Sequence, residues 1–238
     1  MTDLRGKRAF VTGASRGVGR EIARGLADLG CELVLHSRSL EGTREMVQEL
    51  SAKGVKVRAV AGELADAEER DRVLDEVGPV DVLYNNAAIG SRFFEDPWEV
   101  TAEEMRRVFE VDTVAPILIC GRLVPGMLER GFGRVINVTS GIRDQPQRTP
   151  YAIAKAALDK YVRDFAPALS GTGVTMNLLD PGWLRTDLGG PNAPGDVASV
   201  VPGALVPALL DDEISGRWFN AQEYAGRSVS DAVRQAVG

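Results

Sequence analysis

Histidine is almost missing from this chain, since His36 is the only one in 238 residues. Enzymes that use imidazole as a base or as a metal ligand need that side chain at defined places. A metal site of several histidines cannot be built, and a Ser-His-Asp hydrolase would have to use a residue at the end of a predicted strand near the N-terminus. We therefore set both classes aside and expect no metal site.

Cysteine is rare as well: Cys31 and Cys120 have no partners at metal-binding spacing, and we interpret both as reduced core residues. Basic charge is not in excess, because the net charge is −6, whereas a nucleic-acid binder usually shows a basic stripe. No apolar run approaches the ~20 residues of a membrane span, and the first residues lack the apolar core of a signal peptide. We expect a cytoplasmic protein that binds neither nucleic acid nor membrane.

Strand and helix patterns alternate along the whole chain. This order predicts a parallel sheet covered on both faces, in one α/β domain over residues 1–238. Ligands bind beyond the carboxyl ends of such strands, which here carry Gly13, Ser37, Glu63, Asn85 and Ser140. Strands are predicted from Arg8 and at 32–37, 55–62, 80–86, 134–140, 174–182 and 216–220. Helices are predicted after the first glycines and at 40–53, 66–77, 101–130, 151–169 and 196–210, with breaks near Pro116, Pro125 and Pro202.

The first strand is followed by a glycine-rich loop in which Gly13, Gly17 and Gly19 have the spacing G-x-x-x-G-x-G. Glycine permits a tight turn and the close approach of a pyrophosphate, which then meets the free N–H groups of a helix N-terminus. A loop of this kind also occurs as a plain turn in a strand–helix unit.

A second motif is the pair Tyr151 and Lys155, which are four residues apart in an alanine-rich helical run. Residues at this spacing lie on one helical face. A cation close to a phenol stabilises the phenolate, lowers the phenol pKa from about 10 and so suits the group to proton transfer. An isolated pair of this kind is usually an ordinary surface tyrosine and lysine, so the catalytic interpretation depends on the other motifs in the chain.

Together the motifs resemble those of a classical short-chain dehydrogenase/reductase. The matching segments are Thr12–Gly19, Asn85–Ala88, the residues Ser140, Tyr151 and Lys155, and Asp180–Thr186. The resemblance covers most of the chain. It implies a Rossmann-type, doubly wound parallel sheet in a three-layer α/β/α arrangement. It also implies an enzyme that interconverts a small ketone or aldehyde and an alcohol with a nicotinamide cofactor.

The resemblance also implies a role for each matching residue. Tyr151 would be the general acid/base, Lys155 would lower its pKa and hold the nicotinamide ribose, and Ser140 would polarise the substrate oxygen. The residues expected to hold the cofactor are Gly13, Ser15, Arg16, Gly17, Val18, Gly19, Ser37, Arg38, Glu63, Leu64, Asn86, Ala87, Ala88, Tyr151, Lys155, Pro181, Gly182, Trp183 and Thr186.

The end of the second strand predicts the form of the cofactor. An NAD enzyme of this fold expects a carboxylate there, and this chain has Ser37 followed by Arg38, with Arg16 in the glycine loop. Guanidinium groups suit a 2′-phosphate, which a carboxylate would repel. The pattern favours NADP(H) over NAD(H), although either arginine could be a solvated surface charge.

Several features depart from the family pattern. Asp112 stands where the family has a fourth catalytic residue, an asparagine that holds a water relay, and Ala88 replaces a glycine. Ser140 and Tyr151 are slightly closer in sequence than usual, which shortens the loop over the substrate site. Substrate-binding residues are expected in the surrounding loops, and we name Phe93, Ile142, Arg143, Gln145 and Trp183.

Alternative interpretations keep the fold and change the function. Asp112 and Ala88 support a catalytically impaired sensor or scaffold, whereas the intact Ser140, Tyr151 and Lys155 oppose it. Sugar-nucleotide epimerisation is disfavoured by the short chain and by the glycine spacing. The two long helices at 101–130 and 151–169 carry more apolar residues than one buried face needs, and the resemblance then implies a homodimer or homotetramer.

Overall fold

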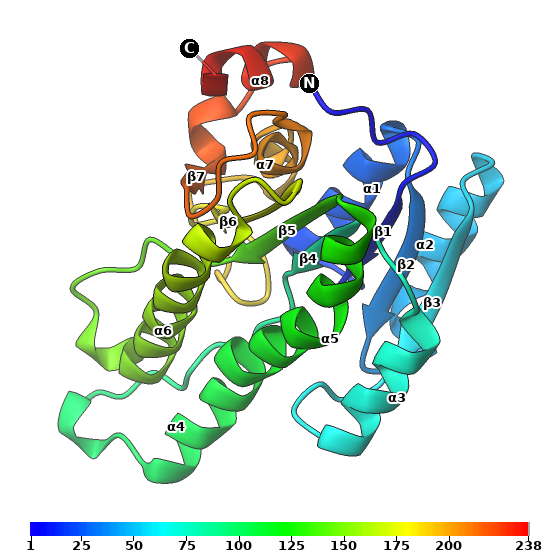
Figure 1. The fold of residues 1–238 in the computed structure, drawn as a ribbon. Helices are drawn as coiled ribbons and strands as arrows, with labels where there is room; N and C mark the ends of the chain where they lie inside the picture. The colour runs from blue at the N-terminus through cyan, green and yellow to red at the C-terminus, as the bar shows by residue number, and fades with distance from the viewer. Residues whose placement is uncertain (238) are drawn as a thin grey trace.

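The computed structural model describes residues 1–237 and is built around a seven-stranded sheet (Figure 1). The strand order is β3-β2-β1-β4-β5-β6-β7, and every neighbouring pair is parallel. From β1 the sheet grows in one direction to β3 and in the other from β4 to β7, which creates a crevice at the carboxyl ends of β1 and β4. The strands are β1 (Arg8–Val11), β2 (Glu32–Ser37), β3 (Val57–Ala61), β4 (Val82–Asn85), β5 (Gly133–Val138), β6 (Val174–Asp180) and β7 (Trp218–Asn220).

Helices cover both faces of the sheet, as predicted for a doubly wound fold. Side chains alternate along each strand, so Ala9 and Val11 belong to one apolar core and Phe10 to the other. The first core joins the sheet to α1, α2, α7 and α8, and the second joins it to α3, α5 and α6. The helices are α1 (Gly17–Asp28), α2 (Leu40–Ala52), α3 (Ala67–Val77), α4 (Ala102–Phe109), α5 (Ala115–Arg130), α6 (Thr149–Phe165), α7 (Val206–Leu209) and α8 (Val229–Val237).

The predicted 101–130 helix is interrupted before Pro116, where a π-helical turn, Glu110–Val114, joins α4 to α5. Proline has no N–H for the helical bond to the residue four positions earlier, here Asp112, so a change of hydrogen-bond pattern at this place is expected. Pro125 does not end the helix, which continues through it to Arg130. The irregular turn is important because it carries Asp112.

Two predictions about the C-terminal quarter were wrong or incomplete. The expected helix at 196–210 is a series of short pieces, two 3₁₀ turns and the four-residue α7, because Pro202 and Pro207 prevent regular helical bonding. The closing helix α8 was not foreseen, although its apolar residues Ala232 and Val233 are buried in the first core.

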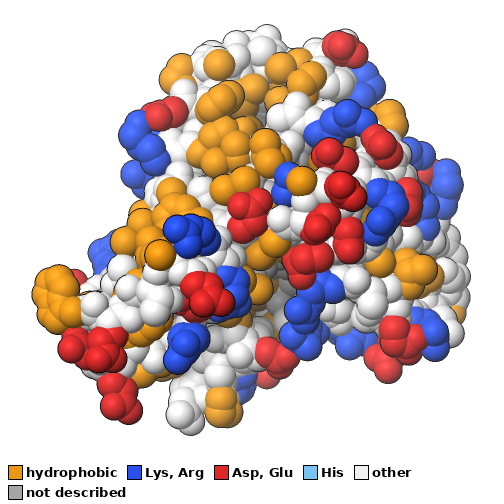
Figure 2. Space-filling model, turned by 90° about the horizontal axis from the view of Figure 1, so that it is seen from below, with side chains coloured by type: hydrophobic (Ala, Val, Ile, Leu, Met, Phe, Trp, Pro, Cys, Tyr) orange, Lys and Arg blue, Asp and Glu red, His pale blue; other side chains and the backbone are white. Residues whose placement is uncertain are grey.

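The continuous helical stretch Ala102–Arg130 is long and apolar enough to cross a membrane by length and composition. More than half of its most apolar part, 56%, is buried within the protein, as in a core helix of a soluble fold, so it is weak evidence for a span. Figure 2 shows one face of the molecule, on which basic and acidic side chains alternate rather than form a basic band.

Candidate active site

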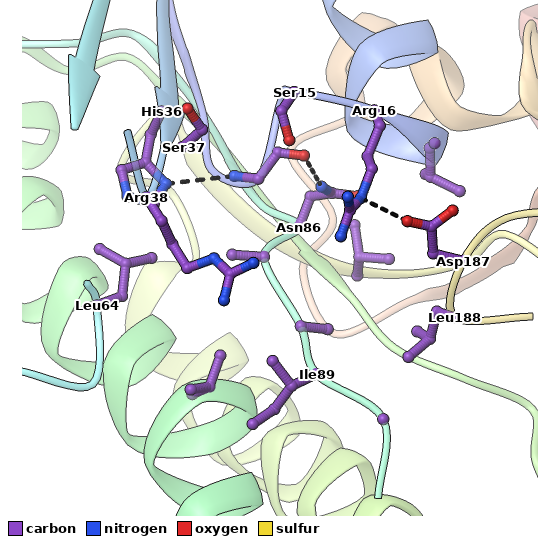
Figure 3. A pocket seen from close by; sticks show the side chains of 18 of the residues that line it. Ser15, Arg16, His36, Ser37, Arg38, Leu64, Asn86, Ile89, Asp187 and Leu188 are labelled. Atoms are coloured by element: carbon purple, nitrogen blue, oxygen red, sulfur yellow. Dashed lines mark hydrogen bonds and ion pairs between the residues drawn. The ribbon is translucent and has the colours of Figure 1, made fainter. Parts of the chain in front are cut away.

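A cleft of about 1160 Å³ opens at the carboxyl ends of the strands, where the order of the sheet reverses. Its walls come from the β1–α1 loop, the ends of β2 and β3 and the segment after β4 (Figure 3). Further parts are α4 with the π-helical turn that follows it, the start of α6 and the loop after β6. Pockets for drug-sized ligands have volumes of roughly 300–1,000 Å³, so this cleft has room for a larger, extended molecule such as a dinucleotide.

The glycine loop is held against the segment after β4 by a closed set of hydrogen bonds. Asn86 Nδ2 donates to the carbonyls of Thr12 (2.8 Å) and Gly13 (3.1 Å), while Thr12 Oγ1 accepts from the backbone N–H groups of Asn86 and Ala87. Gly13 has φ +64°, and a side chain there would lie 2.9 Å from Ala87 Cα. A side chain at Gly19 would overlap Asn86 and the Gly13 carbonyl. These glycines therefore let the two loops and α1 meet closely.

His36 supports this arrangement from beneath the loop. Its Nδ1 accepts from the Gly13 N–H at 3.3 Å, and its Nε2 lies 2.9 Å from the Gly62 carbonyl, to which it donates in the matching tautomer. Burial lowers the pKa of His36, which favours the neutral ring that these bonds require. Its contacts are those of a structural residue.

Tyr151 lies in the first turn of α6, and Lys155 follows on the same face. Lys155 is buried, its Nζ donates to the Val138 carbonyl at 3.1 Å, and it lies 5.7 Å from the centre of the Tyr151 ring. Burial raises the pKa of Tyr151, while the Lys155 charge and the Ser140 hydroxyl act in the opposite direction. The expected cationic effect is present, but desolvation outweighs it and the pKa is raised overall.

Asp112 links three parts of the site. Its Oδ1 accepts from the backbone N–H of Ile89 at 2.8 Å, and its Oδ2 lies 3.4 Å from Lys155 Nζ. The side chain is fully buried, and this desolvation raises the pKa of the carboxyl group, which Lys155 partly opposes. An asparagine could accept the same bond from Ile89 through its amide oxygen, so the substitution preserves this contact.

The two arginines thought to read the cofactor have different surroundings (Figure 3). Arg38 projects from the end of β2 into the cleft near Leu64, and no hydrogen bond or ion pair engages its side chain within residues 1–237. Arg16 also lines the cleft, but its Nε lies 3.0 Å from an Asp187 carboxylate oxygen. Of these two arginines, Arg38 is therefore the one whose positive charge is not paired with a carboxylate of the described residues.

Most of the predicted cofactor residues do line the cleft. Within the described residues, three predicted cofactor residues are absent from the lining: Gly19, Gly182 and Trp183. The predicted catalytic residues Ser140 and Asp112 and all five proposed substrate residues are absent from it as well. Trp183 is 61% exposed and donates through Nε1 to the Gly189 carbonyl at 2.8 Å. The predicted residues found in the lining are Gly13, Ser15, Arg16, Gly17, Val18, Ser37, Arg38, Glu63, Leu64, Asn86, Ala87, Ala88, Tyr151, Lys155, Pro181 and Thr186.

Sequence reasoning missed other residues of the lining. Asp187 and Leu188 directly follow the Thr186 motif and could have been found by extending it. Other missed members lie beside predicted motifs or strand ends: His36, Ser39, Gly42, Ala65, Ile89, Gly90, Val138 and Thr139. Arg106, Arg107, Glu110 and Val111 come from a segment without a recognisable motif, because only the folding of α4 and of the turn after it brings them to the cleft.

The sequence profile of the short chain dehydrogenase family matches residues 7–196, which include the glycine loop, Tyr151 and Lys155. The chain belongs to the short chain dehydrogenase family. It is 31% identical to a short-chain type dehydrogenase/reductase of Picea abies over 248 aligned positions, covering 92% of this chain and 90% of that protein. This membership confirms the resemblance seen in the sequence and identifies the chain as an oxidoreductase enzyme.

Two solved structures extend the comparison to the fold. A metagenomic short-chain oxidoreductase in complex with NADP is 31% identical, with a TM-score of 0.75 over 91% of this chain and 97% of that one. A blue fluorescent protein from a metagenomic library, in complex with NADPH, is also 31% identical, with a TM-score of 0.79 over 92% and 97%. They support a nicotinamide cofactor in this family member.

Proposed function

We propose that this short chain dehydrogenase is an NADP(H)-dependent oxidoreductase that interconverts a ketone or aldehyde and an alcohol. The observation that carries the proposal is the presence of Tyr151 and Lys155 in the same cleft as the glycine loop and Arg38. Oxidation of NADPH in the presence of members of a carbonyl panel is the direct test. Complete absence of turnover, with NADPH bound, would favour the impaired sensor or scaffold.

The residues fit the cofactor because each part of the cleft has a matching chemistry. Gly13 and Gly17 have positive φ and no side chain, so at these two positions a pyrophosphate could approach the helix N-terminus closely. When the dinucleotide is bound, its nicotinamide would supply the hydride chemistry. Asn86, Ala87 and Thr186 line the same cleft and would position the group.

In this proposal the chain itself moves the proton. The Tyr151 phenol donates its proton to the carbonyl oxygen during reduction and becomes a phenolate, and during oxidation the phenolate takes the proton from the alcohol. The Lys155 cation favours the phenolate, and Ser140, whose hydroxyl acts to lower the pKa of Tyr151, would polarise the substrate oxygen. Asp112 lies next to Lys155, with 3.4 Å between its Oδ2 and Lys155 Nζ, and would help to hold the ammonium group in position.

The proposed substrate lies toward the loops after β4 and β5. These loops are joined, because Phe94 donates its N–H to the Gln147 carbonyl at 3.1 Å and Arg148 donates to the Ser91 carbonyl at 3.0 Å. Phe93, Ile142, Arg143 and Gln145 belong to them, and we propose them with Trp183 as the residues that select the substrate. Exposed aromatic groups there suit a bulky, partly apolar molecule.

Arg38 provides the test of cofactor preference. The Arg38→Asp variant should show a KM for NADPH raised by about ten- to hundredfold and better use of NADH, because it replaces a phosphate ligand by an acceptor for ribose hydroxyls. Initial rates with both cofactors measure this. A wild-type enzyme that already prefers NADH would contradict the assignment of Arg38.

We also propose that the protein is a homodimer or homotetramer assembled through α5 and α6. These helices expose Leu118, Leu128, Ile153 and Phe165, at 39–49% of their surface, beyond the residues that they bury in the core. Burial of such side chains between subunits would be favourable. Light scattering should therefore give a mass of two or four times 25.6 kDa, and a clean species at 25.6 kDa would refute the assembly.

A further inference from the structure

The loop after β6, residues 183–195, crosses the cleft as a braced unit that we call the strap. Its two ends are joined by a bridge between Leu184 and Gly195, and Arg185 donates to the Ala193 and Pro194 carbonyls. The Thr186 hydroxyl oxygen accepts from the Gly189 N–H at 3.0 Å. These bonds lie within the strap and fix its shape.

Three consecutive strap residues contact the walls of the cleft. Thr186 lies beside Gly17, where a side chain would meet Thr186 Cγ2 at 3.4 Å, and Leu188 lies against Gly90, where a side chain would meet Leu188 Cδ1 at 2.8 Å. Between them, Asp187 pairs with Arg16 at 3.0 Å. The strap is thus attached to the glycine loop on one side and to the segment after β4 on the other.

Among these three contacts, the ion pair is the only charged and directional one. Arg16 belongs to the loop that precedes α1, so the pair ties the cofactor loop directly to the residue next to Thr186 (Figure 3). We propose that Asp187 is a positioning residue, which holds Thr186 over the bound cofactor through Arg16 and thereby slows cofactor release. This rests on the proposed function, since Thr186 and the cleft are taken to hold NADP(H).

The expected effect is modest, because both partners are largely exposed, at 67% and 71% of their side chains. Exposed ion pairs change an equilibrium by about two- to fivefold at most. Asp187→Asn should therefore raise the dissociation rate of NADPH by about two- to fivefold, as measured by stopped-flow fluorescence of the nucleotide. Asp164→Asn, which removes one partner of the exposed Lys160–Asp164 pair on α6, is the matched control and should leave the rate unchanged.

The sign of the rate change separates this role from a simple charge effect. Removal of a carboxylate near a phosphate site would, by electrostatics alone, strengthen binding and slow dissociation. A positioning role predicts the opposite, a faster dissociation. It also predicts that Asp187→Asn has no further effect in an Arg16→Gln background, since the pair is then already broken.

The outcomes are distinct. A dissociation rate for Asp187→Asn that is unchanged or slower, or an undiminished effect in the Arg16→Gln background, would overturn the role of Asp187 while leaving the oxidoreductase proposal intact. Failure of the wild-type protein to bind NADPH would overturn both. Faster release in Asp187→Asn only when Arg16 is present would establish the role.

Discussion

Tyr151→Phe is expected to reduce turnover by about 10²–10⁴-fold while NADPH binding stays nearly the same. Loss of a positioned proton donor alone costs this much in rate, and the ring, which lies 5.7 Å from Lys155 Nζ, is kept by phenylalanine. Turnover with any carbonyl substrate found in the panel, together with titration of NADPH fluorescence, measures the two quantities separately.

Near wild-type turnover in Tyr151→Phe would remove the general acid/base from the proposal. Tyr161→Phe on the same helix is a suitable control, because it deletes a phenol hydroxyl that does not line the cleft. Its turnover should stay within a few-fold of wild type. The comparison distinguishes the loss of a specific proton donor from a general disturbance of α6.

The second large effect is expected from Lys155→Met, which should lower kcat by about 10²–10⁴-fold and also weaken NADPH binding. In the proposal Lys155 favours the Tyr151 phenolate and holds the cofactor ribose, so both kcat and the affinity for NADPH should fall. Kinetic measurements with saturating NADPH and a separate binding titration test this. An unchanged affinity for NADPH would remove the contact with the cofactor from the role of Lys155.

Asp112→Asn is the control for that variant, because it removes the partner carboxyl but keeps an oxygen that can accept from the Ile89 N–H.

Burial raises the pKa of Asp112, so the folded protein holds the carboxyl proton to a higher pH than the unfolded chain does. The contribution of Asp112 to stability is then complete at low pH and is lost as pH rises through the raised pKa. The Tm of Asp112→Asn minus that of wild type should therefore increase with pH.

If the carboxyl group is protonated near neutral pH, Asp112→Asn should keep kcat within a few-fold and leave the pH optimum in place. A Tm difference that falls as pH rises, together with a shifted optimum, would instead show a charged Asp112 coupled to Lys155 and Tyr151. The double variant Lys155→Met/Asp112→Asn should recover stability without activity, because it removes the unpaired buried carboxyl but not the need for the cation.

The sheet could be predicted because each buried strand appears in the sequence as a short apolar run. Segments such as Glu32–Ser37 and Val174–Asp180 are apolar runs bounded by turn residues, and the predicted strand ends differ from the observed ones by only one or two residues. The C-terminal quarter lacks apolar runs of this kind. Its short turns around Pro202 and Pro207 depend on packing against α1 and the sheet, which a local pattern does not contain.

The same distinction applies to the cleft. Gly13, Tyr151 and Lys155 could be placed because their spacing alone puts them in one loop or on one helical face. The Arg16–Asp187 pair could not be foreseen, since its members are far apart in sequence and meet only when the strap crosses to the glycine loop. Nor could local spacing show that burial would outweigh the Lys155 charge at Tyr151.

The burial of both cysteines also makes the protein convenient for site-specific labelling. Cys31 and Cys120 are the only two in the sequence, and burial raises the pKa of each to about 12. Near pH 7 only about one thiol in 10⁵ is then ionised, so maleimides and similar reagents should not reach the native core. A cysteine introduced by Leu188→Cys would be the one reactive thiol, and a dye attached there would report the position of the strap directly.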